Sequence, residues 1–237
     1  MSIISLKSVC KSFPSGETRI HVLRALDLEI RETDFAVVAA PSGSGKSTLL
    51  NLIGGLDRAD SGAVRIDKVD LAGLKDRALA NLRNEKIGFI FQSFHLIPVL
   101  TAAENVAWPL FLKGVGGRQR MARAKALLER VGLAGLMNRT PGRLSGGQRQ
   151  RVAIARALAC KPKIILADEP TANLDQETAL DVIKLLARLN RDSGVTFVFS
   201  THDQMIEAYA TRRLRLVDGH VVETPAATEF AEGGAHA

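Results

Sequence analysis

The fold of this chain is decided by one stretch of sequence, Ala40-Pro41-Ser42-Gly43-Ser44-Gly45-Lys46-Ser47-Thr48. A continuous apolar run from Phe35 to Ala40 leads into it, as in a strand that is covered on both faces. Residues 46–53 follow as a predicted helix, which Gly54 and Gly55 end. A buried strand, a glycine-rich loop and a helix in this order predict a loop that binds phosphate groups.

The residue types in this loop also predict how it would hold its ligands. Glycines let the backbone close around phosphates, and the N-terminus of the helix contributes free N–H groups. Lys46 is expected to contact the β- and γ-phosphates, and Ser47 to coordinate Mg²⁺. Ala40 stands where such a loop usually has its first glycine, so the backbone there must be one that alanine can adopt. We expect binding to survive this change with a modestly altered affinity.

A second stretch, Ile164 to Ala167, predicts a buried strand that ends in Asp168 and Glu169. An acidic pair at a strand end is most often a solvated turn or a helix cap. Beside a phosphate-binding loop, however, the pair has the chemistry that hydrolysis needs. Asp168 would then hold the water shell of Mg²⁺, and Glu169 would orient and deprotonate the attacking water.

A third stretch, Leu144-Ser145-Gly146-Gly147-Gln148, precedes a predicted helix from Gln148 to Ala159. Small residues in front of a helix leave its first N–H groups accessible, which makes a second site for an anion. The sequence therefore contains two predicted anion-binding helix ends, about a hundred residues apart.

The remaining pattern predicts a parallel α/β core that is interrupted by a helical block from Ser93 to Ala159. Apolar residues with strand periodicity occur at 26–30, 64–66, 87–91 and 195–200. Helical periodicity covers 117–131, and a helix capped by Asp175 is expected to run to about Asp192, where Gly194 ends it. Thr101 and Glu104 have the spacing of a capping box.

Composition narrows the class of protein. Of 237 residues, 46% are hydrophobic and 24% charged, which is typical of a globular chain. The net charge of +7 indicates an anionic partner such as a nucleotide, a nucleic acid or an anionic lipid. Apolar runs stay well short of the ~18 residues that span a bilayer, and the N-terminus does not resemble a signal peptide, so we expect a cytoplasmic protein. Two distant cysteines, Cys10 and Cys160, exclude a disulfide framework, and we expect both in the core.

In chain order, the phosphate loop at 40–48, the stretch at 144–148, the pair Asp168-Glu169 and a lone His202 after the next strand resemble the ATP-binding-cassette (ABC) ATPases. The resemblance covers about residues 3–222. It implies an α/β fold: a RecA-like P-loop core with an antiparallel β subdomain (about 3–92 and 160–222) and an inserted α-helical subdomain (about 93–159). Residues 223–237 are expected to form a flexible tail. The resemblance further implies a homodimer in which ATP lies between the phosphate loop of one copy and the Leu144–Gln148 stretch of the other.

The resemblance also assigns roles to single residues. Gln92 matches the glutamine that contacts Mg²⁺ or the attacking water and links the site to a membrane partner. His202 matches the histidine that contacts the γ-phosphate. Phe13 stands where the family places an aromatic residue against adenine; it offers a ring face without the hydroxyl of the more usual tyrosine. Residues 173–175 match a loop that crosses the dimer interface.

Closer matches point to the lipoprotein-release and macrolide-export group of the family. They cover residues 91–98, 104–106, 109–110, 168–175 and 213–219, whereas Ala172, Thr33 and Asp34 depart from the usual residues. The resemblance implies an ATPase that drives an integral-membrane permease, for export or extraction of lipids, lipoproteins or amphiphiles. It would sit peripherally on the inner face of the membrane.

Two other functions stay open. One is a cassette that acts on nucleic acid or ribosomes, although such proteins usually carry two cassettes or a coiled-coil insert, so no nucleic acid is expected. The other is a regulatory ATPase that signals through a permease-like partner. A GTPase is excluded because the NKxD guanine motif is missing.

Two surfaces have alternative interpretations. The apolar stretch 94–100 would either line a groove for a permease helix or belong to the core of the helical subdomain. The basic stretch 118–130 would face either anionic lipid or solvent.

Overall fold

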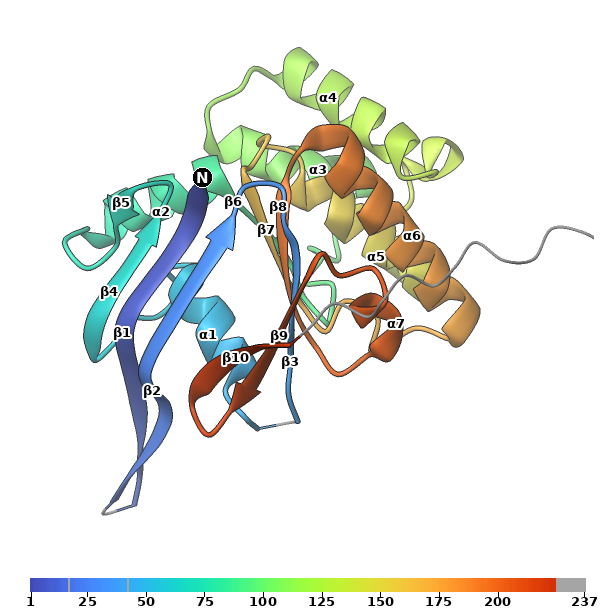
Figure 1. The fold of residues 1–237 in the computed structure, drawn as a ribbon. Helices are drawn as coiled ribbons and strands as arrows, with labels where there is room; N and C mark the ends of the chain where they lie inside the picture. Colours follow the sequence, from blue (N-terminus) through green and yellow to red (C-terminus); the bar gives the residue numbers. More distant parts are fainter. Residues whose placement is uncertain (17, 42, 225–237) are drawn as a thin grey trace, which may run out of the picture.

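The computed structural model describes residues 1–16, 18–41 and 43–224, and it contains two sheets and a block of helices (Figure 1). The larger sheet has six strands in the order β10-β9-β3-β8-β7-β6. Its strands are β3 Phe35–Ala39, β6 Ile87–Ile90, β7 Ile164–Asp168, β8 Thr196–Thr201, β9 Arg212–Val217 and β10 His220–Thr224. All neighbours are parallel except β10, which pairs antiparallel with β9.

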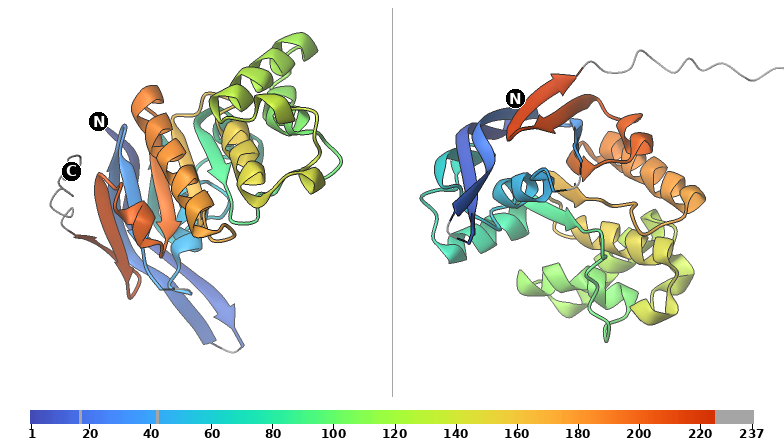
Figure 2. Two further views of the ribbon diagram at one scale, coloured as in Figure 1. Left: turned by 90° about the vertical axis from the view of Figure 1, so that its right-hand side faces the viewer. Right: turned by 90° about the horizontal axis from the view of Figure 1, so that it is seen from below.

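The central strands of this sheet are buried on both faces, as their continuous apolar runs predict. Phe35 and Val37 of β3 pack into one hydrophobic core with α3 to α6, whereas Ala36 and Val38 pack into a second core with α1 and the smaller sheet. Figure 2 shows the sheet between these two layers. The predicted RecA-like α/β core is therefore present.

The smaller sheet is antiparallel, in the order β2-β1-β4-β5. It consists of β1 Ser2–Ser15, β2 Thr18–Arg31, β4 Ser61–Ile66 and β5 Val69–Asp70. The long β1–β2 hairpin extends beyond the rest of the molecule (Figure 1). This sheet corresponds to the expected antiparallel β subdomain.

The helices are α1 Lys46–Ile53, α2 Asp76–Lys86, α3 Ala102–Leu112, α4 Gly117–Arg130, α5 Gly146–Ala157, α6 Gln176–Ser193 and α7 Gln204–Glu207. Thr101 caps α3 in a complete capping box with Glu104, and Asp175 caps α6. Gly194 ends α6 in the left-handed conformation. In the described part of the chain, no helix is both long and apolar enough to cross a membrane.

Four expectations need correction. Helix α5 begins at Gly146 rather than Gln148, because Ser145 caps it. Glu223 and Thr224 belong to β10 instead of the expected tail; the remaining tail residues lie outside the described part. Cys10 and Cys160 are half-buried rather than in the core. Helix α2 was not predicted, because only two of its residues, Leu79 and Leu82, are buried and most of the others are polar or charged.

Candidate nucleotide-binding site

The phosphate-loop sequence forms the turn between β3 and α1, and two of its glycines are required by the geometry. Gly43 and Gly45 have φ angles of 78° and 97°, where side chains are strained. A Cβ on Gly45 would also lie 2.4 Å from Cγ1 of Val22. Ala40 is buried and is not in the left-handed region, so alanine fits there as predicted. Ser42 lies outside the described residues.

Lys46, the first residue of α1, is held over the loop. Its ammonium group donates hydrogen bonds to the carbonyl oxygens of Ala40 at 2.6 Å and Pro41 at 2.9 Å. The residue is only 6% exposed. A buried ammonium needs acceptors, and here the loop carbonyls supply them. An arriving phosphate would offer a stronger, charged acceptor at the same place.

A cavity of about 360 Å³ opens beside this loop. Its lining residues are Phe13, Val22, Gly43, Gly45, Lys46, Ser47, Thr48, Gln92, Asp168 and Glu169. They come from the small sheet, the phosphate loop and the C-terminal ends of β6 and β7. Because parallel strands end at one edge of their sheet, the fold brings these distant residues together.

Asp168 presents a buried carboxylate oxygen to the cavity. Its Oδ1 atom is buried and has no hydrogen-bond partner among the residues that the structure describes. An ionised carboxylate accepts bonds but cannot donate them, so this oxygen suits a metal ion or its water. Ser47 and Gln92 line the same cavity and offer further oxygen atoms. The donor set therefore fits Mg²⁺.

Glu169 is fixed by the end of β8. Its Oε1 atom lies 2.8 Å from Nδ1 of His202, and its Oε2 accepts a hydrogen bond of 2.9 Å from the Thr201 hydroxyl. The Lys46 ammonium is 4.0 Å from Oε1. The backbone N–H of Glu169 donates to Ser200 O, and its φ is 44°, a strained value for a residue with a side chain. A strained residue in a cavity, held by several partners, is typical of a reacting group.

Sequence reasoning missed Thr201. It immediately precedes His202 and is fully buried, yet its hydroxyl contacts both the Glu169 carboxylate and the N–H of Asp203. Threonine is common in strands because its side chain is β-branched, so its presence at the end of β8 gives no sequence signal of this role.

The Leu144–Gln148 stretch lies elsewhere. Ser145 and Gln148 form a reciprocal capping box at the start of α5, with distances of 3.3 and 3.0 Å. Gly147 packs so tightly that an added Cβ would lie 2.3 Å from Cγ2 of Thr178. Among the described residues that line the 360 Å³ cavity, none comes from this stretch. The predicted helix end is therefore formed, but it does not line the 360 Å³ cavity.

Two further predicted residues contact the site region. Asn173 donates a hydrogen bond of 2.9 Å from its side-chain amide to the Gln92 carbonyl. Phe13 is 39% exposed, and the Lys11 ammonium lies 5.0 Å from the centre of its ring. An exposed ring at the mouth of the cavity can stack with a base.

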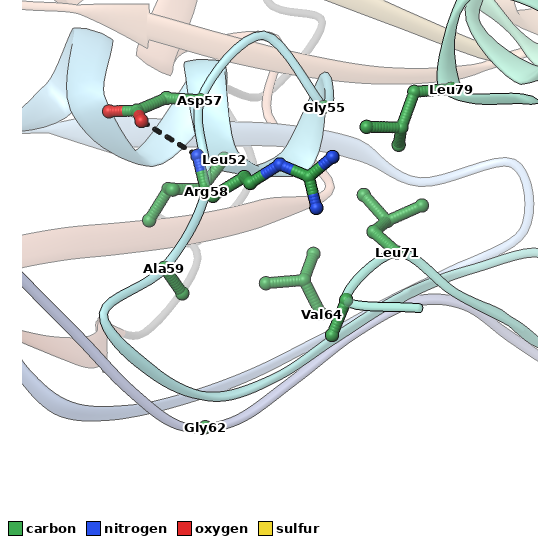
Figure 3. A pocket seen from close by; sticks show the side chains of 10 residues that line it. Leu52, Gly55, Asp57, Arg58, Ala59, Gly62, Val64, Leu71 and Leu79 are labelled. Carbon is green, nitrogen blue, oxygen red and sulfur yellow. Dashed lines mark hydrogen bonds between the residues drawn. The ribbon is translucent and has the colours of Figure 1, made fainter. Parts of the chain in front are cut away.

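A second, smaller cavity lies between α1, α2 and β4, away from these residues (Figure 3). Leu52, Val64, Leu71 and Leu79 form its apolar walls, and Arg58 lies across it. Its volume of about 120 Å³ is too small for a nucleotide, so it does not compete with the phosphate-loop cavity.

The fold and the site together define a P-loop ATPase in which the capped N-terminus of α5 does not line the phosphate-loop cavity. The sequence profile of the ABC transporter family matches residues 23–172, and the chain belongs to that family. It is an ATP-hydrolysing cassette, as the sequence predicted.

Its relatives agree with the predicted subgroup. The chain is 48% identical over 221 residues to the lipoprotein-releasing system ATP-binding protein LolD of Geobacter metallireducens, covering 93% of this chain and 98% of that protein. It is 46% identical to the macrolide export ATP-binding/permease protein MacB of Neisseria gonorrhoeae, covering 94% of this chain but 34% of that longer protein. A solved cassette, MJ0796, is a dimer in a post-hydrolysis state bound to ADP and Pi. It is 44% identical, with a TM-score of 0.87, and the match covers 95% of this chain and 100% of that one.

Proposed function

We propose that this chain is the nucleotide-binding subunit of a complex in which a homodimer of cassettes drives an integral-membrane permease. The observation that carries the proposal is the division of the site: Lys46, Gln92, Asp168 and Glu169 line one cavity, whereas the Ser145–Gln148 helix end does not line it. A second copy, placed head to tail, would bring that helix end to the phosphates. The dimeric state of the solved cassette supports this arrangement.

The residues of this chain have separable roles in the proposed hydrolysis. Lys46 would exchange its bonds to the loop carbonyls for bonds to phosphate oxygens. Glu169, held in place by Thr201 and His202, would orient the attacking water and accept its proton. Ser47, Gln92 and Asp168 would hold Mg²⁺, which when bound supplies neutralisation of the phosphate charge.

The permease would dock in a groove between the core and the helical subdomain. This groove has a volume of about 530 Å³ and includes Phe89 and Phe91 at the end of β6, Pro109 and Leu112 of α3, and Arg156 of α5. Within the 94–100 stretch, Leu96 packs partly on the core, whereas Val99 is 81% exposed. The stretch is therefore not simply subdomain core, which supports the groove interpretation. A protein so docked would lie peripherally on the inner face of the membrane.

The names of the relatives support a substrate class. LolD belongs to a lipoprotein-releasing system, and MacB is a macrolide export protein. We therefore propose extraction or export of a lipid-bearing or amphiphilic substrate, which the permease would contact.

Glu169→Gln tests the composite site. Removing the proton acceptor while keeping the side-chain shape should abolish ATP turnover and trap a closed dimer with Mg²⁺ and ATP, measured by light scattering after gel filtration. Glu29→Gln, an exposed change on β2, is the matched control and should hydrolyse ATP normally. A Glu169→Gln protein that stays monomeric under saturating Mg-ATP would refute the split site.

The partner is tested with the same trapped variant. Tagged Glu169→Gln protein, incubated with detergent-solubilised native membranes and Mg-ATP, should co-purify one integral membrane protein in stoichiometric amount, identified by mass spectrometry. Nucleic acid or ribosomal protein in its place would overturn the transporter role. A permease without transport activity in reconstituted vesicles would favour the regulatory alternative.

A further inference from the structure

The end of α3 carries exposed apolar side chains that the proposed site does not use. Trp108, Phe111 and Leu112 are 40%, 50% and 63% exposed. The opposite side of the same helix is buried in the core through Ala103, Val106 and Leu110, which leaves α3 apolar on both sides. An apolar face beyond the one that the core needs points to a contact outside the chain.

Cations outnumber carboxylates around this apolar face, where Glu104 lines the same hollow as Trp108 and Phe111. The sequence from residue 105 to residue 128 contains no aspartate or glutamate. Its five positive residues are Lys113, Arg118, Arg120, Arg123 and Lys125. Lys113, Arg118 and Lys125 are exposed, and the Arg120 guanidinium lies 5.2 Å from the centre of the Phe111 ring. We call residues 108–120, from Trp108 to Arg120, the α3–α4 corner.

We propose that the α3–α4 corner contacts the anionic phospholipid surface of the membrane directly. Trp108 and Phe111, with ring centres 5.4 Å apart, would occupy the boundary between headgroups and acyl chains. Lys113 and Arg118 would reach the lipid phosphates beside them. The contact is shallow, because it involves one helix end and a short turn.

The size and composition of the corner favour lipid over a protein partner. Three partly exposed side chains offer far less than the roughly 800 Å² that a stable protein interface buries on each partner. The turn after them contains Gly114, Gly116 and Gly117, so no large side chain there blocks the apolar residues from a flat surface. Five cations against one neighbouring carboxylate, Glu104, leave this face with an excess of positive charge that complements a surface of anionic headgroups.

The orientation of the corner rests on the proposed function. Leu112 belongs to the corner and also lines the 530 Å³ groove proposed for the permease. A cassette docked through that groove faces the membrane with this side, so the corner would lie beside the permease, where lipid headgroups are.

Trp108 is the only tryptophan in the chain, so its fluorescence reports on the corner alone. The purified full chain, without any permease, should show a blue-shifted Trp108 emission with vesicles of phosphatidylglycerol and phosphatidylcholine. Brominated lipids in the same vesicles should quench it. The shift should be weak with pure phosphatidylcholine and should decrease with added salt.

Paired variants separate the two contributions. Phe111→Ser should reduce vesicle binding about tenfold, whereas Val222→Ser, which removes an apolar side chain 53% exposed on β10, should not. Lys113→Gln and Arg118→Gln should each weaken binding by about fivefold. Lys184→Gln, an exposed change on α6, is the control for charge. ATP hydrolysis by all these variants should be unchanged, because none of these residues lines the nucleotide cavity.

Two results would overturn the proposal. One is an unchanged Trp108 spectrum with anionic vesicles at low salt. The other is a blue shift that appears only when the permease is added in detergent, which would assign the corner to the protein partner. Dimer formation by Glu169→Gln is measured without membranes, so failure of the composite site and failure of lipid contact are distinguished.

Discussion

Asn105 is expected to be the most important polar residue of the helical subdomain for stability. It is fully buried in α3, and its side-chain Oδ1 accepts a hydrogen bond of 2.7 Å from the N–H of Ile97. Its Nδ2 donates to the carbonyl oxygens of Ile97, Leu100 and Thr101 at 3.0–3.1 Å. One side chain therefore fixes the backbone of the 97–101 segment, which adjoins the proposed permease groove.

The cost of Asn105→Ala follows from these contacts. Thr101 O and Ile97 O keep backbone partners, the N–H groups of Asn105 and Leu100, so neither is left unpaired. The side chain has two N–H donors and one accepted bond, so the variant loses about three hydrogen bonds, at about 1 kcal/mol each, which gives roughly 3 kcal/mol. For a chain of this length that corresponds to a fall in Tm of roughly 6–12 °C.

Urea and thermal unfolding, followed by circular dichroism, measure this effect. Asn105→Asp keeps the size and the acceptor but loses both N–H donors and places a carboxylate against carbonyl oxygens, so it should destabilise at least as much. Asn81→Ala, on the exposed face of α2, is the control and should change stability by less than about 0.5 kcal/mol. A loss below 1 kcal/mol for Asn105→Ala, together with a tolerated Asn105→Asp, would refute the reasoning.

Three further outcomes are expected. Phe13→Ala should raise the Kd of a fluorescent ATP analogue by about tenfold through loss of stacking on the base, whereas Phe13→Tyr should stay within about twofold; equal affinity of Phe13→Ala and the native chain would show that the ring does not contact adenine. Gly147→Ala should impair ATP-dependent dimerisation in light scattering without weakening nucleotide binding by the monomer, and Thr178→Ser should restore it by removing the Cγ2 atom 2.3 Å from the new Cβ; no rescue would mean that this contact is not the cause. Hydrogen bonds from Lys163 and Lys86 lower the pKa of Asp67, so its contribution to stability is present above the ordinary aspartate pKa and is lost as the pH falls through the lowered value. Asp67→Asn should therefore cost up to about 1 kcal/mol in urea unfolding at pH 7 and nothing at strongly acidic pH, and an equal cost at both would exclude the ionic origin.

The core of the fold could be predicted because local and global signals agree there. β3, α1, β7 and α6 each have the apolar pattern, cap or terminating glycine that their place in the fold requires. α2 lacked such a signal: it contains mainly polar and charged residues, and contacts with its neighbours stabilise it instead. Periodicity detects only elements that bury a regular face.

The site could be predicted by residue type more than by geometry. The sequence placed Glu169 and His202 after two strands, but only the folded chain shows them 2.8 Å apart, with Thr201 as a second partner of the carboxylate. The left-handed backbone of Glu169 has no sequence signal, since glutamate rarely adopts it. Geometry of this kind depends on packing of distant strands, which no local pattern encodes.

Helix α5 connects the two halves of the proposed mechanism. It begins at the capping box of Ser145, and near its other end Arg156 donates a hydrogen bond of 2.8 Å to Phe94 O and another to His95 O. Burial lowers the pKa of Arg156 to about 10, so the guanidinium still carries its charge at neutral pH. Phe94 and His95 both have left-handed backbones, with φ of 60° and 46°, and follow Gln92 and Ser93 in the sequence.

The strained segment after Gln92 is therefore held by α5, whose N-terminus is the proposed second anion-binding site. Arg156 also lines the 530 Å³ groove, so a partner seated there would contact the same bracing residue. Because an α-helix is stiff along its axis, displacement of one end of α5 must move the other. A partner in the groove and a nucleotide at the dimer interface would then act on the same rigid helix, so α5 alone could couple the two sites.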